Sequence, residues 1–246
     1  LFLILKDIKA IGKNYYGKIK STLGYKTEYA KIFKESDPAY YEKVFSGKPL
    51  VLENFLTFLK THDDIKSVLE IGCSTGIFPI RYNEYFSDKQ YTGLDISQKC
   101  IEYCKDHSSF DFMCEDFIKK DIQDTWDLVF AFDVIDHVYD VELFMKNLVK
   151  ATKKHAYVAA YYGYFPELEK HSRKWDDKDG IYFNSLSVNN LKQNMRENGL
   201  KLGENLPSVL NYKGLVILYI KKQLLKFTVK INFDKILFYS LIMCLT

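Results

Sequence analysis

The sequence predicts an α/β fold: a doubly wound, mostly parallel sheet of seven strands with one antiparallel strand, preceded by N-terminal helices. Two observations predict it. From residue 67 onward, short apolar segments alternate with segments of helical periodicity, as expected when parallel strands are joined by crossover helices. The last two apolar segments follow each other with no helix between them, which is typical of a hairpin that places one strand antiparallel.

The predicted strands are short and rich in apolar residues. They cover Ser67–Ile71, Gln90–Leu94, Phe110–Cys114, Trp126–Phe132, Ala156–Tyr161, Lys201–Glu204 and Gly214–Lys221. The helices predicted in this region cover Ile77–Phe86, Gln98–Asp106, Val141–Thr152 and Val188–Asn198. The stretch between residues 162 and 187 is predicted to be irregular.

The chain ahead of the first strand has a helical pattern. Residues 1–19 place apolar side chains at helical spacing with lysines on the other faces, which predicts an amphipathic basic helix. Further helices are predicted over Glu28–Lys34, Ala39–Phe45 and Leu50–Lys60. We therefore divide the chain into a helical N-terminal extension or cap (1–65), an α/β core (66–222) and an apolar, basic C-terminal tail (223–246).

Charge is unevenly distributed although the net charge is only +3. Residues 1–26 hold six Lys and one Asp, and residues 221–246 hold five Lys and one Asp, so the central region is acidic. An acidic centre argues against a nucleic-acid partner. The basic, apolar ends suit peripheral contact with an anionic membrane surface, or equally lysines that keep apolar tails in solution. The longest apolar run, Ile236–Leu245, is too short to span a bilayer.

The five cysteines are an odd number and show no metal-ligand spacing. We therefore expect reduced thiols, no metal site and a cytoplasmic protein, with or without membrane contact. Because the sequence begins at Leu1 rather than Met, it can be part of a longer chain. Its composition does not indicate an oligomeric state.

A glycine-containing loop follows the first predicted strand, in the segment VLEIGCSTGIF at residues 68–78. Gly72 and Gly76 allow a sharp turn and the close approach of a ligand to the backbone. Glu70, Cys73 and Ser74 complete the candidate ligand loop, although Cys73 is equally interpreted as a small buried filler. A plain tight turn is the alternative interpretation of both glycines.

Acidic residues follow the next three predicted strands. Because the carboxyl ends of parallel strands meet at one edge of a sheet, we expect these acids to line one crevice. A carboxylate after the second strand suits two ribose hydroxyls, and an acid beside an aromatic ring after the third suits the amino group and face of adenine. The alternatives are that the first acid caps the helix near Gln98 and that the second is an ordinary turn residue. The candidate ligand residues are Asp95 and Ile96, Asp116 and Phe117, and Asp133 and Val134.

In this order the motifs resemble those of class I S-adenosylmethionine-dependent methyltransferases, in the group that includes quinone-biosynthesis enzymes. The usual first motif of that family is acidic-x-Gly-x-Gly-x-Gly, and Ser74 stands here in place of the middle glycine. The resemblance maps the ribose-binding acid onto Asp95, the adenine-contacting acid onto Asp116 and the family segment DVLEHV onto residues 133–138. It covers about residues 66–221 and implies a Rossmann-like fold with S-adenosylmethionine as cofactor.

A nicotinamide dinucleotide site is the rival interpretation of the same loop. Its Gly-x-Gly-x-x-Gly pattern would need glycine where Ser74 and Ile77 stand, which disfavours it. The resemblance instead implies methyl transfer. Because the chain is small, has no basic central face and offers aromatic residues for a pocket, we expect a small-molecule, sugar- or lipid-linked acceptor that is methylated on oxygen. His137 and His171 are the candidate general bases, and a structural hydrogen bond is the alternative role of His137.

Three other functions remain open. A non-catalytic module that only binds S-adenosylmethionine would keep the loop and the acids without the chemistry. A membrane-peripheral protein would use its basic ends, with the enzyme domain secondary. A methyltransferase acting on a protein or nucleic acid uses the same cofactor fold, but DVID stands after the fourth strand where an Asn-Pro-Pro-Tyr-like segment would mark base or glutamine amino groups.

Overall fold

The computed structural model describes residue 26 and residues 28–44, 50–160, 164–165, 167–197 and 216–221. Its strands are β1 (Ser67–Ile71), β2 (Gln90–Asp95), β3 (Asp111–Cys114), β4 (Trp126–Phe132), β5 (Thr152–Ala160), β6 (Tyr164–Phe165), β7 (Ser172–Asp176), β8 (Ile181–Ser187) and β9 (Val216–Lys221). Its helices are α2 (Lys31–Glu35), α3 (Pro38–Val44), α4 (Leu50–Thr61), α5 (Ile77–Arg81), α6 (Gln98–His107), α7 (Val141–Ala151) and α8 (Val188–Glu197), with short 3-10 turns η1 (Asn83–Tyr85) and η2 (Ile135–His137).

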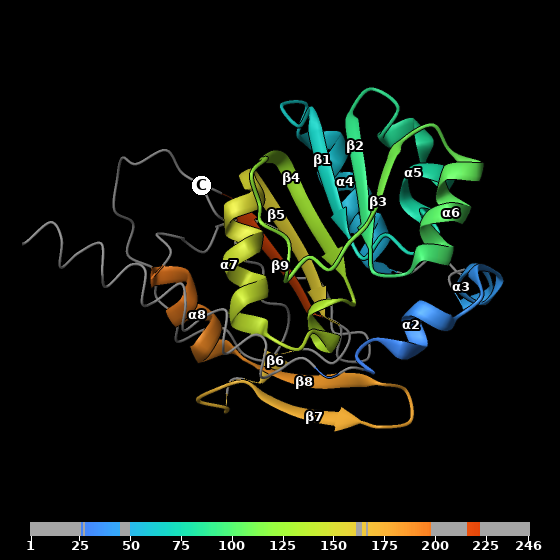
Figure 1. Ribbon diagram of the computed structural model, residues 1–246. Coiled ribbons are helices and arrows are strands. Elements are labelled where there is room, and N and C mark those ends of the chain that lie inside the picture. Colours follow the sequence, from blue (N-terminus) through green and yellow to red (C-terminus); the bar gives the residue numbers. More distant parts are fainter. Residues whose placement is uncertain are drawn as a thin grey trace, which may run out of the picture.

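The large sheet has the strand order β3-β2-β1-β4-β5-β9 (Figure 1). Strands β1 to β5 are parallel, and β9 pairs antiparallel with β5. This arrangement confirms the doubly wound, mostly parallel sheet with one antiparallel strand. The predicted strand at Lys201–Glu204, which would make the seventh, lies outside the described residues, as do the segments 1–25 and 222–246.

The two faces of the sheet carry separate apolar cores. Alternate residues of β4 point to opposite faces, because side chains along a strand alternate. Leu128 and Phe130 pack with Phe55 of α4 on one face. Val129 packs with Phe144 of α7 on the other, where α7 is seen in front of the sheet in Figure 1. This double coverage explains why the central strands consist almost entirely of apolar residues.

Most described elements begin and end within about three residues of their predicted bounds, and two boundaries differ by more. The helix expected over Ile77–Phe86 stops at Arg81 and gives way to η1, because Tyr82 leaves the helical conformation. Strand β5 begins at Thr152 rather than at Ala156, and Thr152 already pairs with Trp126 of β4.

The stretch predicted to be irregular forms a second sheet, so that prediction was wrong. It contains β6, β8 and β7 in that order, with β7 and β8 joined as an antiparallel hairpin. The hairpin turns at Gly180, whose φ of +66° a glycine adopts without strain and whose N–H donates to the Asp176 carbonyl at 2.9 Å. Figure 1 shows this hairpin below the large sheet, on the side of α2.

The segment before α2 docks on this hairpin rather than standing apart from the core. The Ala30 N–H donates to the Gly180 carbonyl at 2.6 Å, and the Tyr29 ring meets the Tyr139 ring edge-on with centroids 4.9 Å apart. Tyr29 and Ala30 are buried in the same core as α7. In the described part of the chain, no helix combines the length and apolar character needed to cross a membrane.

Candidate functional site

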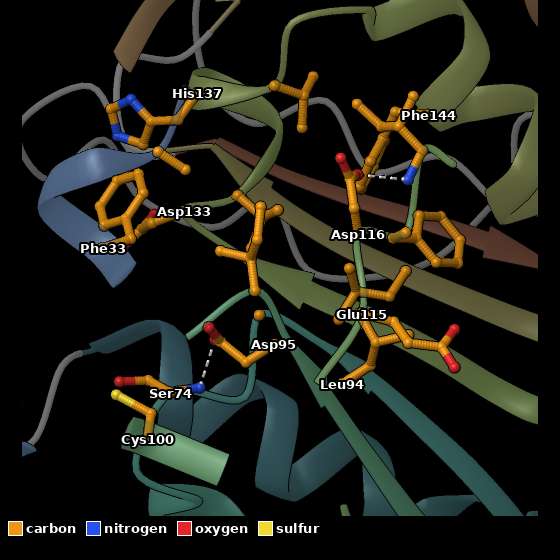
Figure 2. A pocket seen from close by; sticks show the side chains of 18 of the residues that line it. Phe33, Ser74, Leu94, Asp95, Cys100, Glu115, Asp116, Asp133, His137 and Phe144 are labelled. Carbon is orange, nitrogen blue, oxygen red and sulfur yellow. Dashed lines mark hydrogen bonds between the residues drawn. The ribbon is translucent and has the colours of Figure 1, made fainter. Parts of the chain in front are cut away.

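A cavity of about 240 Å³ opens at the carboxyl ends of β1, β2 and β4. It lies where the β1–α5 loop, the loop after β3 and the turn after β4 meet (Figure 2). Open parallel sheets bind ligands at this edge because the loops diverge there. Its lining residues are Tyr29, Ala30, Phe33, Tyr41, Ile71, Gly72, Ser74, Leu94, Asp95, Ile96, Cys100, Glu115, Asp116, Phe117, Ile118, Phe132, Asp133, Val134, His137, Val138 and Phe144.

Gly72 brings the β1–α5 loop against the turn after β4. Its φ is +75°, and a Cβ added there would lie 2.3 Å from Cγ2 of Val134, so a larger residue would both strain and clash. Ser74, which replaces the middle glycine of the expected motif, keeps the left-handed conformation with a φ of 48°. The loop geometry therefore survives this substitution.

Asp95 ties the first two strand ends together. One carboxylate oxygen accepts the Ser74 N–H and the other accepts the Ser97 N–H, both at 2.8 Å. Burial raises the pKa of this carboxyl, and the backbone hydrogen bonds oppose that rise. The cap of α6 is Ser97, whose Oγ accepts the Cys100 N–H, so the predicted alternative role of Asp95 as the cap is wrong.

Asp116 presents a buried oxygen that accepts no hydrogen bond from the described residues. Its Oδ1 accepts the Ile118 N–H at 3.0 Å, whereas its Oδ2 is buried without a hydrogen-bond partner among the described residues. Lys119 Nζ lies 3.9 Å from that oxygen. The Phe117 ring packs edge-on against Phe144 at 5.4 Å and adds an apolar surface beside the carboxylate.

Asp133 is the second unsatisfied carboxyl group of the cavity. It follows β4 in the left-handed conformation, with a φ of 56°, and Oδ1 is buried without a partner in the described structure. Burial raises its pKa to about 6. Ala30, Ser74 and Asp133 are the non-glycine residues with positive φ in the described chain, and all three line this cavity. Strained backbone of this kind gathers at functional sites.

His137 lies on the same turn as Asp133, and Figure 2 shows both on one side of the cavity with Phe33. Its Nδ1 is 2.9 Å from the Tyr182 carbonyl oxygen, which can only accept, so Nδ1 carries the proton and Nε2 is the acceptor nitrogen of the neutral ring. Burial lowers the pKa of this imidazole. A neutral histidine with a defined tautomer can accept a proton from a ligand.

Four predicted site residues do not line the cavity. The buried Glu70 carboxylate accepts a hydrogen bond from the Tyr91 hydroxyl, and burial holds its pKa well above the usual range. Cys73 is buried in the apolar core on the α4 side of the sheet, and Gly76 precedes α5 with a φ of 67°. His171 Nδ1 accepts the Ser187 N–H at 2.9 Å, which joins the start of β7 to the end of β8.

The N-terminal segment supplies a wall that the sequence interpretation missed. Tyr29 and Phe33 are four residues apart, a spacing that places both on one helical face and could have indicated a buried surface. The Phe33 ring lies 5.4 Å from the His137 ring. Glu42 of α3 accepts the Thr75 hydroxyl at 2.8 Å and pairs with Arg81, which fixes this wall to the β1–α5 loop.

A family model described as a methyltransferase domain matches residues 43–205, about two thirds of the chain. The chain belongs to this family of S-adenosylmethionine-dependent methyltransferases. The match spans β1 to β8 and every cavity-lining residue from Ile71 onward. It confirms the predicted family, enzyme class and cofactor.

Curated methyltransferases match a shorter stretch. Pavine N-methyltransferase of Thalictrum flavum is 31% identical over 91 residues, which are 35% of this chain and 26% of that protein. Ubiquinone biosynthesis O-methyltransferase of Bradyrhizobium diazoefficiens is 31% identical over 91 residues, which are 35% of each chain. The matches therefore span about a quarter to a third of the length of these relatives.

Solved methyltransferases share the fold over much more of the chain. Magnesium protoporphyrin IX methyltransferase of Synechocystis, with bound S-adenosylmethionine, superposes with a TM-score of 0.55 and 12% identity, covering 79% of this chain and 95% of that one. The O-methyltransferase of a Brevibacillus brevis polyketide multienzyme gives a TM-score of 0.53 with 17% identity, covering 74% and 61%. At these identities the likeness concerns the fold alone.

Proposed function

We propose that this methyltransferase transfers the methyl group of S-adenosylmethionine to an oxygen atom of a small-molecule, sugar- or lipid-linked acceptor. One observation carries the proposal. The turn after β4 presents an unsatisfied carboxyl group, Asp133, and a neutral histidine, His137, to a cavity whose other end has the features of a cofactor cradle.

The cavity residues fit this cofactor. Asp95, held at both oxygens by backbone N–H groups, keeps acceptor capacity for the ribose hydroxyls. Asp116 Oδ2 is buried and accepts no hydrogen bond from the described residues, which suits the adenine amino group, and Phe117 lies beside it for the adenine face. Gly72 allows close approach of the backbone. The bound cofactor supplies a methyl group already activated on a sulfonium.

His137 is the proposed general base for an acceptor hydroxyl. Burial keeps the imidazole neutral, and the Nδ1 hydrogen bond to Tyr182 directs Nε2 as the proton acceptor. Asp133 Oδ1 is proposed to accept a hydrogen bond from a different polar hydrogen of the acceptor molecule and so to orient that molecule. Positioning of this kind supplies much of the acceleration when the transferred group is already activated.

A nitrogen acceptor is the second candidate. No Lys or Arg is among the described residues that line the cavity, while Asp95, Glu115, Asp116 and Asp133 all are. An acidic lining favours a neutral or cationic acceptor over an anionic one. The similarity to an N-methyltransferase as well as an O-methyltransferase supports keeping both candidates.

The first test is isothermal titration of the full chain with S-adenosylhomocysteine. We expect saturable binding with a stoichiometry near one. We expect Asp95→Ala to weaken it at least about tenfold, because the carboxylate that accepts from two backbone N–H groups and is proposed to accept from the ribose is lost. A folded chain that does not bind would contradict the proposal.

The second test identifies the methylated atom. The chain is incubated with a small-molecule extract and methyl-labelled S-adenosylmethionine, and labelled products are analysed by mass spectrometry and NMR. A labelled methoxy product supports the oxygen acceptor, a labelled N-methyl product supports the second candidate, and labelled protein or nucleic acid alone would contradict both. The matched control is His137→Gln, which should still bind S-adenosylhomocysteine.

We also propose a cytoplasmic protein, on the evidence of its five cysteines without metal-ligand spacing. The lysines in residues 1–26 and 221–246 support the further proposal that its basic ends contact anionic membranes. Sedimentation of the full chain with anionic vesicles should recover it in the pellet, and with neutral vesicles in the supernatant. Recovery of the chain in the supernatant with both kinds of vesicle would refute the proposed membrane contact.

A further inference from the structure

Two buried asparagines each bridge two backbone carbonyl groups, one on each side of the cavity. Asn184 of β8 donates from Nδ2 to the carbonyls of Ile135 at 2.9 Å and Val138 at 2.8 Å. Asn147 of α7 donates from Nδ2 to the carbonyls of Phe117 at 2.9 Å and Ile118 at 3.1 Å. The first pair belongs to the turn after β4 and the second to the loop after β3.

The orientation of the Asn184 amide follows from its partners. Both are carbonyl oxygens, which only accept, so the nitrogen must face them and both of its hydrogens are used. The residue is 2% exposed, and its Oδ1 is buried without a hydrogen-bond partner in the described structure. Ile135 is the first residue of η2, and Val138 directly follows its last residue. One amide therefore spans the whole turn.

Strand β8 also holds the imidazole of His137, which lies on the turn after β4. His137 lies between the two bridged residues, and its Nδ1 donates to the carbonyl of Tyr182, two residues before Asn184 on β8. The turn backbone and the histidine ring are therefore both fixed by β8, one through a side-chain amide and the other through a backbone carbonyl. Loss of the amide would free the backbone to which the ring is attached.

We propose that Asn184 is a positioning residue for methyl transfer: by bridging Ile135 and Val138 it holds His137 in the orientation and tautomer that a base needs. This inference rests on the proposed function, because it gives His137 the role of proton acceptor. Asn184 itself does not line the cavity. It acts through the turn that it closes.

Asn147 is the matched comparison. It uses the same chemistry, is also buried, at 8% exposure, and bridges carbonyls beside Asp116 on the cofactor side of the cavity. Removing its amide should disturb the loop proposed to hold adenine and leave His137 unchanged. We therefore expect loss of the Asn184 amide to change the His137 ring and not cofactor binding, and loss of the Asn147 amide to do the reverse.

The experiment uses the full chain with Asn184→Ala and Asn147→Ala, and it needs no identified acceptor. Titration with S-adenosylhomocysteine reports the cofactor site, and the ¹⁵N shifts of the His137 ring, assigned with His137→Gln, report its tautomer. For Asn184→Ala we expect a mixture of tautomers and a Kd within about twofold of the parent chain. For Asn147→Ala we expect an unchanged tautomer and a Kd raised at least about fivefold.

An unchanged His137 tautomer in Asn184→Ala would overturn the inference, as would equal changes of both readouts in both variants. If Asn184→Ala does not fold, as judged by near-ultraviolet circular dichroism, Asn184→Ser is used, since the serine hydroxyl can still donate one hydrogen bond. Asn184→Ser should also populate the second His137 tautomer, and a tautomer ratio equal to that of the parent chain would overturn the inference. A parent chain that fails to bind S-adenosylhomocysteine would refute the proposed function instead.

Discussion

Replacing Asp133 by Asn should make the ligand-free protein more stable above pH 6 while impairing methyl transfer. The Asp133 side chain lies in the cavity with Oδ1 buried and without a partner in the described structure, and burial raises its pKa from the usual 3.8 to about 6. Asn is uncharged, similar in shape and tolerated at a φ of 56°, so the substitution removes the buried charge without adding backbone strain.

The sign and size of the effect follow from linkage. Between about pH 4 and 6 the folded state keeps a proton on Asp133 that the unfolded state releases, so the free energy of unfolding falls as pH rises through this window. A pKa raised from 3.8 to about 6 corresponds to about 3 kcal/mol, at 1.36 kcal/mol for each pKa unit. Asp133→Asn should therefore gain up to about 3 kcal/mol at pH 8 and nothing at pH 3.5.

Urea unfolding of the parent chain and Asp133→Asn between pH 3.5 and 8 measures this difference. Asp127→Asn is a control of opposite sign. Burial pushes the pKa of Asp127 up, but hydrogen bonds from the Lys66 and Ser67 N–H groups and the ion pair with Lys154 outweigh it, and the pKa is lowered. Asp127→Asn should therefore destabilise the protein at pH 7, and the loss should shrink as pH falls through the lowered pKa.

A gain in Asp133→Asn that does not depend on pH would refute the reasoning, because the stabilisation must follow ionisation of the carboxyl group. A loss of stability at pH 8 would also refute it, since it would mean that the ionised Asp133 makes favourable contacts. Catalytic impairment should accompany the stability gain: the variant should bind S-adenosylhomocysteine at least as tightly as the parent chain and transfer methyl groups more slowly.

Three further substitutions test other parts of the site. Gly72→Ala should cost about 2 kcal/mol or more, measured by urea unfolding, because the residue has a φ of +75° and a Cβ would meet Val134; an unchanged midpoint would contradict the clash. His137→Gln should lower turnover about 10²–10⁴-fold with an unchanged Kd for S-adenosylhomocysteine, and full activity would exclude it as the base. Phe33→Ala should enlarge the cavity beside His137 and change which compounds of an extract become labelled, whereas an identical product pattern would place the acceptor elsewhere.

The sequence predicted those parts of the fold whose signals are local. Strands β1 and β4 were predicted with their observed bounds, because strands buried on both faces appear as continuous apolar runs. The hairpin β7–β8 was missed because its first strand is short and mostly charged and its residues are largely exposed. The signal that could have found it was the Asp179-Gly180 pair between the two strands, a common turn sequence in hairpins.

Within the site, sequence reasoning succeeded where position along a strand decides position in space. Asp95, Asp116 and Asp133 each follow a parallel strand, so the topology brings them to one cavity. Glu70 and His171 did not follow that rule. The side chain of Glu70 leaves β1 on the face where Tyr91 lies, and His171 sits where it joins two strands of the second sheet.

The sequence by itself therefore determined the large sheet, the family and the cofactor. Its strands are continuous apolar runs, and the motifs that follow them are short segments that can be recognised one after another along the chain. Only the tertiary structure decided what surrounds the acceptor side of the cavity. Tyr29 and Phe33 reach it because Ala30 bonds to Gly180, and Asn184 closes the turn of His137 from a strand that the sequence did not reveal. The physical reason is that these contacts join residues far apart in the chain, and no local pattern encodes such pairs.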